Sequence, residues 1–176
     1  VIEDESLPRS ASLIINTFLF KTPINIVFTN GEPERNFIKK LCELDNAEKI
    51  DSWIKSRDMN FYSIEYSLTI GGRHTKTLSF NPDFFIKLKN GKTTHFVVIE
   101  IKSNDDITNE NQAKLKYGLQ HFKDLNKELE KQKINKKYHF HFLSPNSYDV
   151  FFKYLKDGRL IEYEFKSDLE YNLAQF

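Results

Sequence analysis

Residues 80–103, FNPDFFIKLKNGKTTHFVVIEIKS, decide the predicted fold of this chain. Apolar side chains in two runs predict strands over residues 84–89 and 95–102. The pair Asn90-Gly91 between the runs is a strong hairpin signal, because both residues tolerate the positive φ angles of a tight hairpin turn. The segment therefore predicts two neighbouring antiparallel strands.

Two acids and one lysine occupy the ends of these strands. A two-residue loop would place Asp83 opposite Val98, whereas a four-residue loop would place Asp83 opposite Glu100. Either register leaves Asp83, Glu100 and Lys102 on one face of the sheet, because side chains alternate between the faces of a strand. The two carboxylates would then lie roughly 5 to 8 Å apart. An odd loop or a bulge would separate them.

These residue types in this arrangement predict a divalent metal site. Two like charges on a partly buried face raise at least one pKa unless a cation neutralises them. Mg²⁺ takes oxygen ligands in octahedral geometry, commonly one or two carboxylates completed by water and substrate phosphate. We expect Asp83 and Glu100 to bind Mg²⁺, with the carbonyl of Ile101 as a third ligand and Mn²⁺ as a substitute ion. Lys102 would orient the attacking water and offset charge on the phosphate.

The same segment resembles the signature of the PD-(D/E)XK nuclease superfamily, and the resemblance extends over residues 31–157. Glu34, in GEPERNFIKKL, resembles the acid that these nucleases often carry on a preceding helix. The order of the other segments is similar to the C-terminal endonuclease domain of type III restriction enzyme Res subunits and related helicase-nucleases. These segments are WIKS at 53–56, FYSIEYSL at 61–68, NQAKLKYGLQHFKDLN at 111–126 and YHFHFLSPNSYDVFFKYL at 138–155.

This resemblance implies a restriction-endonuclease-like α/β fold and a Mg²⁺-dependent endonuclease that hydrolyses DNA. It also implies a DEAD-box-like translocase in cis or in trans, a role in defence, and a dimer for double-strand cleavage. Glu34 would join the metal site. The chain has no G-x-x-x-x-G-K-[ST] segment, so it contains no motor of that class. Because the first residue is Val, we expect the chain to be excised from a larger helicase-nuclease.

The remaining patterns predict one α/β domain with a mixed central sheet, in which a parallel strand extends an antiparallel meander between flanking helices. Residues 1–30 are expected to be a lead-in or docking segment, residues 31–157 the catalytic core, and residues 158–176 a C-terminal strand and tail. Helices are predicted over residues 32–44, 47–56, 108–133 and 148–155. Strands are predicted over residues 24–28, 61–70, 74–80, 84–89, 95–102, 138–143 and 160–165.

Composition excludes several classes of protein. With 26 basic and 25 acidic residues the net charge is +1, so affinity for DNA has to come from local patches. The single cysteine, Cys42, excludes an internal disulfide framework and a cysteine-based zinc cluster. The sequence shows no signal peptide and no apolar run of about eighteen residues. We therefore expect a soluble, cytoplasmic protein without a membrane partner.

The candidate residues also have structural interpretations. Glu34 lies in a first helical turn, where the helix dipole favours an acid. Lys102 could act only as the counterion of Glu100, and that pairing would look the same in sequence. Lys114 lies at the edge of the apolar stripe of its helix, and we expect it to contact a DNA phosphate.

Two other features carry less weight. His139 and His141 share a strand face but lack a third ligand, so we expect no metal there. Gln112 and Tyr117 resemble the Gln-Tyr helix motif of some nucleases, with the spacing off by one residue. The alternative to an enzyme is a catalytically inert nuclease-like module for nucleic-acid binding or protein interaction. The retention of two acids and a lysine around a buried strand favours the enzyme.

Overall fold

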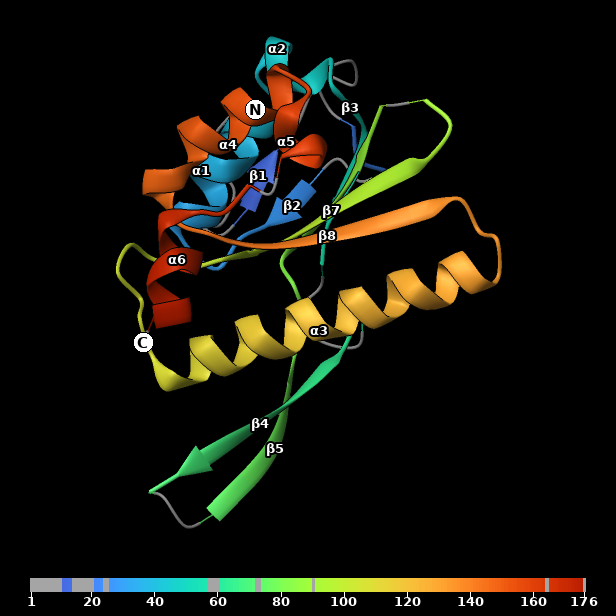
Figure 1. Cartoon of the computed structure of the whole chain (residues 1–176). Helices are drawn as coiled ribbons and strands as arrows, with labels where there is room; N and C mark the ends of the chain where they lie inside the picture. Colours follow the sequence, from blue (N-terminus) through green and yellow to red (C-terminus); the bar gives the residue numbers. More distant parts are fainter. Residues whose placement is uncertain are drawn as a thin grey trace.

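A four-stranded mixed sheet forms the centre of the molecule (Figure 1). In order across the sheet, the strands are β3 (Ile50–Lys55), β6 (Phe84–Leu88), β7 (Thr94–Ile101) and β8 (Lys136–Leu143). β6 is antiparallel to β3 and β7, whereas β8 is parallel to β7, as predicted for a strand reached by a long helical crossover. The computed structural model describes residues 11–13, 21–23, 26–56, 61–71, 74–89, 91–163 and 165–175.

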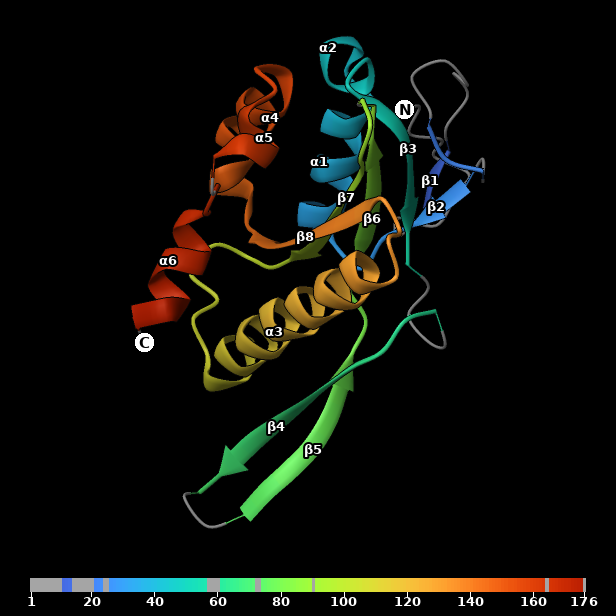
Figure 2. The same cartoon turned by 45° about the vertical axis from the view of Figure 1, so that its right-hand side comes forward.

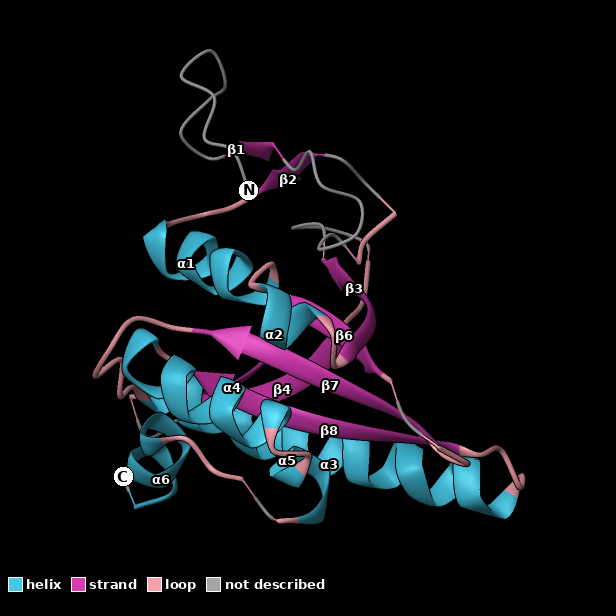
Figure 3. Cartoon of the chain, turned by 90° about the horizontal axis from the view of Figure 1, so that it is seen from above, coloured by secondary structure: helices cyan, strands magenta, loops and turns pink. Residues whose placement is uncertain are grey.

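The sheet lies between two helical layers (Figures 2 and 3). The layers are α1 (Glu32–Leu41), α2 (Leu44–Ala47) and α4 (Tyr148–Lys156) on one face and α3 (Asn109–Lys131) on the other. Alternation along β7 divides the core, because Val97 and Ile99 are buried with Phe37 of α1, whereas Val98 is buried with Phe122 of α3. The mixed α/β class and the helices predicted at the positions of α1, α3 and α4 are confirmed.

The β6–β7 register sets the position of the acids. Phe84 pairs with Ile99, and Phe85 pairs with Val98. One further step along this ladder places Asp83 opposite Glu100, which is the register predicted for a four-residue loop.

The strands β4 (Ile64–Ile70) and β5 (His74–Phe80) form a separate antiparallel hairpin that projects from the body of the molecule (Figures 1 and 2). The predicted meander is therefore wrong at one step, since the ladder does not continue from β5 to β6. Pro82, between the two strands, has no N–H for a ladder hydrogen bond. Tyr66 and Phe80 are instead buried in the core on the α3 side.

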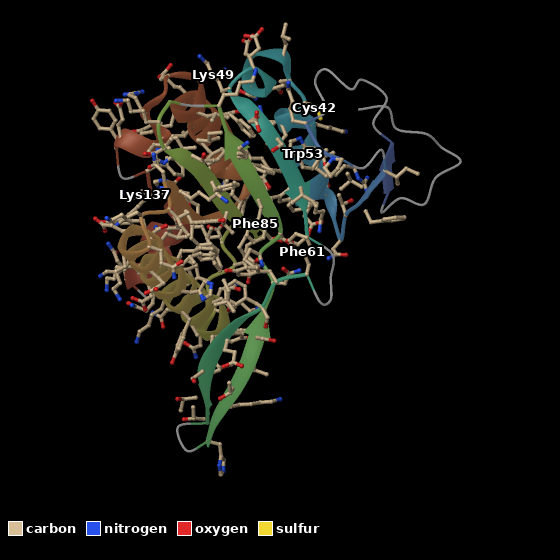
Figure 4. All side chains as sticks on the ribbon, turned by 90° about the vertical axis from the view of Figure 1, so that its right-hand side faces the viewer. Cys42, Lys49, Trp53, Phe61, Phe85 and Lys137 are labelled. Atoms are coloured by element: carbon tan, nitrogen blue, oxygen red, sulfur yellow. The ribbon has the colours of Figure 1, made fainter. Side chains whose placement is uncertain are left out.

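Aromatic side chains fill the junction between the sheet and the hairpin (Figure 4). The ring of Phe85 lies 5.8 Å from that of Phe61 and 5.3 Å from that of Tyr62. The hydroxyl of Tyr62 also hydrogen-bonds Nε2 of His121 on α3 at 2.7 Å. These contacts fix the base of the hairpin against both the sheet and α3.

The helix predicted over residues 47–56 is wrong, because α2 ends at Ala47 and the chain then enters β3. Trp53 and Ile54 favour strands, and their backbone pairs with Ile86 and Phe85 of β6. Pairing with a distant strand therefore overrides the local helical pattern.

The C-terminal segment forms helices instead of the predicted strand over residues 160–165. Gly158 adopts a φ of 72°, a left-handed conformation that suits glycine, and turns the chain into α5 (Arg159–Glu162). Leu160 is buried in the core on the α4 side. The last helix, α6 (Asp168–Gln175), was not predicted.

The lead-in segment is described in part. β1 (Ala11–Leu13) pairs antiparallel with β2 (Ile26–Phe28), which confirms the strand predicted over residues 24–28 from Ile26 onward. Residues 24 and 25, like residues 1–10 and 14–20, lie outside the described residues. No helix in the described part of the chain is both long and apolar enough to span a membrane.

Candidate active site

Asp83 and Glu100 lie side by side at one end of the sheet. Glu100 is the penultimate residue of β7 and is only 4% exposed. Asp83 immediately precedes β6, and its Oδ2 accepts a hydrogen bond of 2.7 Å from the backbone N–H of Ile101. The carbonyl of Asp83 accepts a second bond of 2.8 Å from the N–H of Ser56, after β3. The strands on both sides of β6 thus fix the position of this acid.

Lys102 lies over Glu100. Its Nζ is 2.6 Å from Glu100 Oε1, and both side chains are largely buried. The second oxygen, Glu100 Oε2, is buried and has no hydrogen-bond partner within the described structure. A buried carboxylate oxygen without a partner is costly, so this atom marks a place where a ligand fits.

Glu34 brings a third acid to the same region. It lies in the first turn of α1, and its Oε2 accepts a hydrogen bond of 2.8 Å from the N–H of Asn30. Lys55, the last residue of β3, places its Nζ 3.3 Å from the same oxygen and 5.8 Å from the centre of the Phe84 ring. Both Glu34 and Lys55 are buried. The sequence analysis missed Lys55, because it assigned this stretch to a helix. A strand ending beside Phe84 would have placed Lys55 next to Asp83.

The pKa values report how closely these groups interact. Burial raises the pKa of Asp83 well above its usual value, and the charges of Glu100 and Glu34 raise it further. Burial also raises the pKa of Glu100, against the attraction of Lys102. For Lys102, burial acts to lower the pKa, but the neighbouring Glu100 carboxylate outweighs it and the pKa is raised. Without an added cation, both acids therefore hold a proton more readily than a free carboxyl group does.

Lys114 approaches this cluster from α3. Its charge acts on Glu100, while its Nζ pairs with Glu110 Oε1 at 2.7 Å and lies 5.6 Å from the centre of the Tyr66 ring. The Tyr66 hydroxyl donates to the same Glu110 oxygen at 2.9 Å. Burial and this hydrogen bond raise the pKa of Tyr66 to about 12. Tyr66 and Glu110, which no sequence signal singled out, thus hold Lys114 beside the acids.

Comparison with protein families agrees with this geometry. The family model described as TnsA-like endonuclease N terminal matches residues 48–139. The chain belongs to the TnsA-like endonuclease N-terminal family. Because this is a restriction-endonuclease-like nuclease family, the match confirms the PD-(D/E)XK superfamily predicted from sequence. This match does not show the predicted resemblance to type III restriction enzymes. No curated protein and no solved structure matches the chain significantly.

The matched region of this TnsA-like chain contains Asp83, Glu100, Lys102 and Lys114, whereas Glu34 precedes it. Within the described ranges, no group of three or more His, Cys, Asp and Glu side chains is arranged to bind a metal ion. The site offers instead two adjacent carboxylates, one of them with a partnerless oxygen. Such a donor set fits an ion that completes its shell with water and phosphate, as Mg²⁺ commonly does.

The two strand histidines lie apart from this site and have other partners. His139 Nε2 is 2.9 Å from Nδ1 of His95 on β7, and burial lowers the pKa of His139 to about 4. His141 Nδ1 lies 3.2 Å from Oε1 of Glu170 on α6. Gln112, from the loose Gln-Tyr pattern, donates to the carbonyl of Leu173 instead.

Proposed function

We propose that this TnsA-like domain hydrolyses DNA phosphodiester bonds with Mg²⁺ held by Asp83 and Glu100. The observation that carries the proposal is the partnerless, buried Oε2 of Glu100 in register with Asp83, while Lys102 holds the other oxygen. A bound Mg²⁺ would lower the pKa of a water molecule and polarise the phosphoryl oxygen. Family membership supports the endonuclease activity, and the donor set supports the choice of ion.

The other proposed ligands are consistent with the strand geometry. The N–H of Ile101 points to the Asp83 carboxylate. Since a strand residue directs its N–H and C=O toward the same side, the Ile101 carbonyl also faces that side and can serve as the third ligand. Oε2 of Glu34 is already engaged by Asn30 and Lys55, so Glu34 would bind the ion, or one of its waters, through Oε1.

The lysines would act on the substrate. Lys102 can turn from Glu100 toward the attacking water and the phosphate, because a divalent ion would take over the neutralisation of the acid. Lys114 would contact the phosphate from α3, with Glu110 and Tyr66 keeping it oriented. Three carboxyl groups, those of Glu34, Asp83 and Glu100, face Lys55 and Lys102 in the metal-free site. Because metal binding needs ionised carboxylates, Mg²⁺ binding should tighten as the pH rises through the raised pKa values of Asp83 and Glu100.

The wider setting stays a prediction. The translocase, the type III restriction system, the dimer and Mn²⁺ as a substitute ion remain predictions from the sequence, since the TnsA-like family match names none of them. The inert-module alternative is less consistent with the site, because a module without catalysis gains nothing from three neighbouring acids, two of them buried.

Nicking of supercoiled plasmid by wild type and Glu100→Gln, in Mg²⁺ and in EDTA, tests the proposal. Glu128→Gln is a control, since Glu128 is an exposed acid far along α3. We expect nicking only by wild type and the control, and only with Mg²⁺. Equal nicking by Glu100→Gln would exclude this site as the catalytic centre.

A further inference from the structure

A second surface suited to substrate binding lies between the β4–β5 hairpin and α3. A groove of about 1030 Å³ separates them, lined by Ser67, Thr69 and Thr75 on the hairpin and by Lys116, Gln120 and Lys123 on α3. Its lining combines hydroxyl, amide and ammonium groups with apolar side chains such as Leu68, Leu119 and Leu173, and contains no aspartate or glutamate. The groove therefore selects for an anionic partner rather than a cationic one.

The lysines of α3 divide into two sets. Lys114, Lys127 and Lys131 each form an ion pair with an acid on the same helix. Lys116 and Lys123, the two that line the groove, are exposed and form no ion pair with a described residue. They are seven residues apart and hence separated by about 10.5 Å along the helix axis. Two spaced, unpaired cations suit an extended polyanion better than a single small anion.

The hairpin contributes Ser67, Thr69 and Thr75 to the rim of this groove, beside the apolar Leu68. Ser67 pairs with Thr77, and Thr69 pairs with Thr75, so that these hydroxyl side chains share one face of the ribbon. The opposite face carries the apolar side chains that anchor the hairpin in the core. Hydroxyl groups donate and accept hydrogen bonds, and in nucleic-acid interfaces they commonly contact phosphate and sugar.

An exposed aromatic ring completes the set. Tyr117 lines the groove and is 37% exposed, so part of its ring is open to a ligand. Proteins that bind single strands combine a basic groove along the backbone with aromatic rings on which bases stack. The groove has both components.

We infer that this groove binds a single-stranded segment of the DNA substrate. The inference rests on the proposed nuclease function for the identity of the polyanion. α3 begins seven residues after Lys102, so the catalytic lysine and the groove are linked by one short connection. A strand held in the groove would anchor the substrate independently of the metal site, which compensates for the low overall charge of the chain.

The test is the salt dependence of binding to a fluorescent single-stranded oligonucleotide in EDTA, where cleavage cannot occur. The Lys116→Gln/Lys123→Gln variant removes two phosphate contacts, so the slope of log K against log salt should fall by about 1.4. The matched control is Lys127→Gln/Lys131→Gln, which removes the same charge from the same helix outside the groove. Tyr117→Ala should weaken binding at least about 5-fold, as expected from lost stacking.

Equal slopes for the groove variant and the control would overturn the inference, as would a loss confined to duplex DNA. The experiment distinguishes a failure of the groove inference from a failure of the proposed nuclease function. Wild-type protein that fails to cut DNA in Mg²⁺ but shows the groove-dependent slope would reject the nuclease proposal alone. Wild-type protein that cuts DNA while the groove variant binds normally would reject the groove alone.

Discussion

Replacing Lys102 by Met separates two roles of this lysine. In the structure its Nζ lies 2.6 Å from Glu100 Oε1, and the other oxygen of Glu100 has no partner among the described residues. Lys102→Met therefore leaves the buried Glu100 carboxylate without its ion-pair partner. Breaking a buried pair in this way costs about 3–5 kcal/mol, and partial exposure of Lys102 places our expectation near the lower figure, about 3 kcal/mol.

The loss of stability should depend on pH. Without Lys102, the pKa of Glu100 would rise further above its unfolded value, because burial then acts unopposed by that lysine. A raised folded-state pKa stabilises the protein at pH values below the unfolded pKa, and this contribution is lost as the pH rises through the folded pKa. Lys102→Met should thus be nearly as stable as wild type at low pH and clearly less stable at high pH. Urea denaturation at several pH values measures the difference.

Excess Mg²⁺ distinguishes a counterion from a catalytic group. Saturating Mg²⁺ should restore much of the stability of Lys102→Met, because the ion neutralises Glu100 directly. Single-turnover cleavage should nevertheless remain about 100-fold slower than wild type, the scale of losing one preorganised donor to the transition state. Cleavage at the wild-type rate in saturating Mg²⁺ would refute this reasoning and leave Lys102 a structural counterion.

Three further expectations follow from the same structure. Metal-free wild-type protein should lose stability as the pH rises through the raised pKa values of Asp83 and Glu100, and Mg²⁺ should abolish this loss, as thermal melts with and without EDTA can check. Gly118→Ala should destabilise the fold by about 1–3 kcal/mol, because an added Cβ would clash with the ring of Phe140; unchanged urea midpoints would contradict this packing. Lys55→Met should lower stability and weaken cleavage together, since Lys55 holds the acid of α1, and a variant with normal Mg²⁺ affinity and turnover would show that this pair is dispensable.

The pairing of β6 with β7 was predictable because the signals for it lie close together in the sequence. Two apolar runs and a turn signal between them indicated two strands, and any loop with an even number of residues placed Asp83 and Glu100 on one face. The exact register needed the structure, since two-residue and four-residue loops were both compatible with the sequence. Lys102 followed from Glu100 through the same alternation.

The parts that were missed depend on distant contacts. β3 forms because β6 lies beside it, and no local pattern identified that partner; the position of Lys55 was lost with it. The β4–β5 hairpin separates from the sheet because Tyr66 and Phe80 are buried against α3. This contact joins segments that are far apart in sequence. Tyr66 and Glu110 likewise meet across 44 positions of the chain to hold Lys114. A single tyrosine or glutamate carries no sequence pattern that would predict such a long-range contact.

The most direct test of the proposed site is a calorimetric Mg²⁺ titration of wild type and of Asp83→Asn/Glu100→Gln, run beside a single-turnover DNA cleavage assay. Asp124→Asn, at an exposed acid on α3, is the matched control. The structure predicts that wild type and the control bind Mg²⁺ and cut DNA, whereas the double variant stays folded and does neither. A double variant that still cut DNA at the wild-type rate would contradict the account.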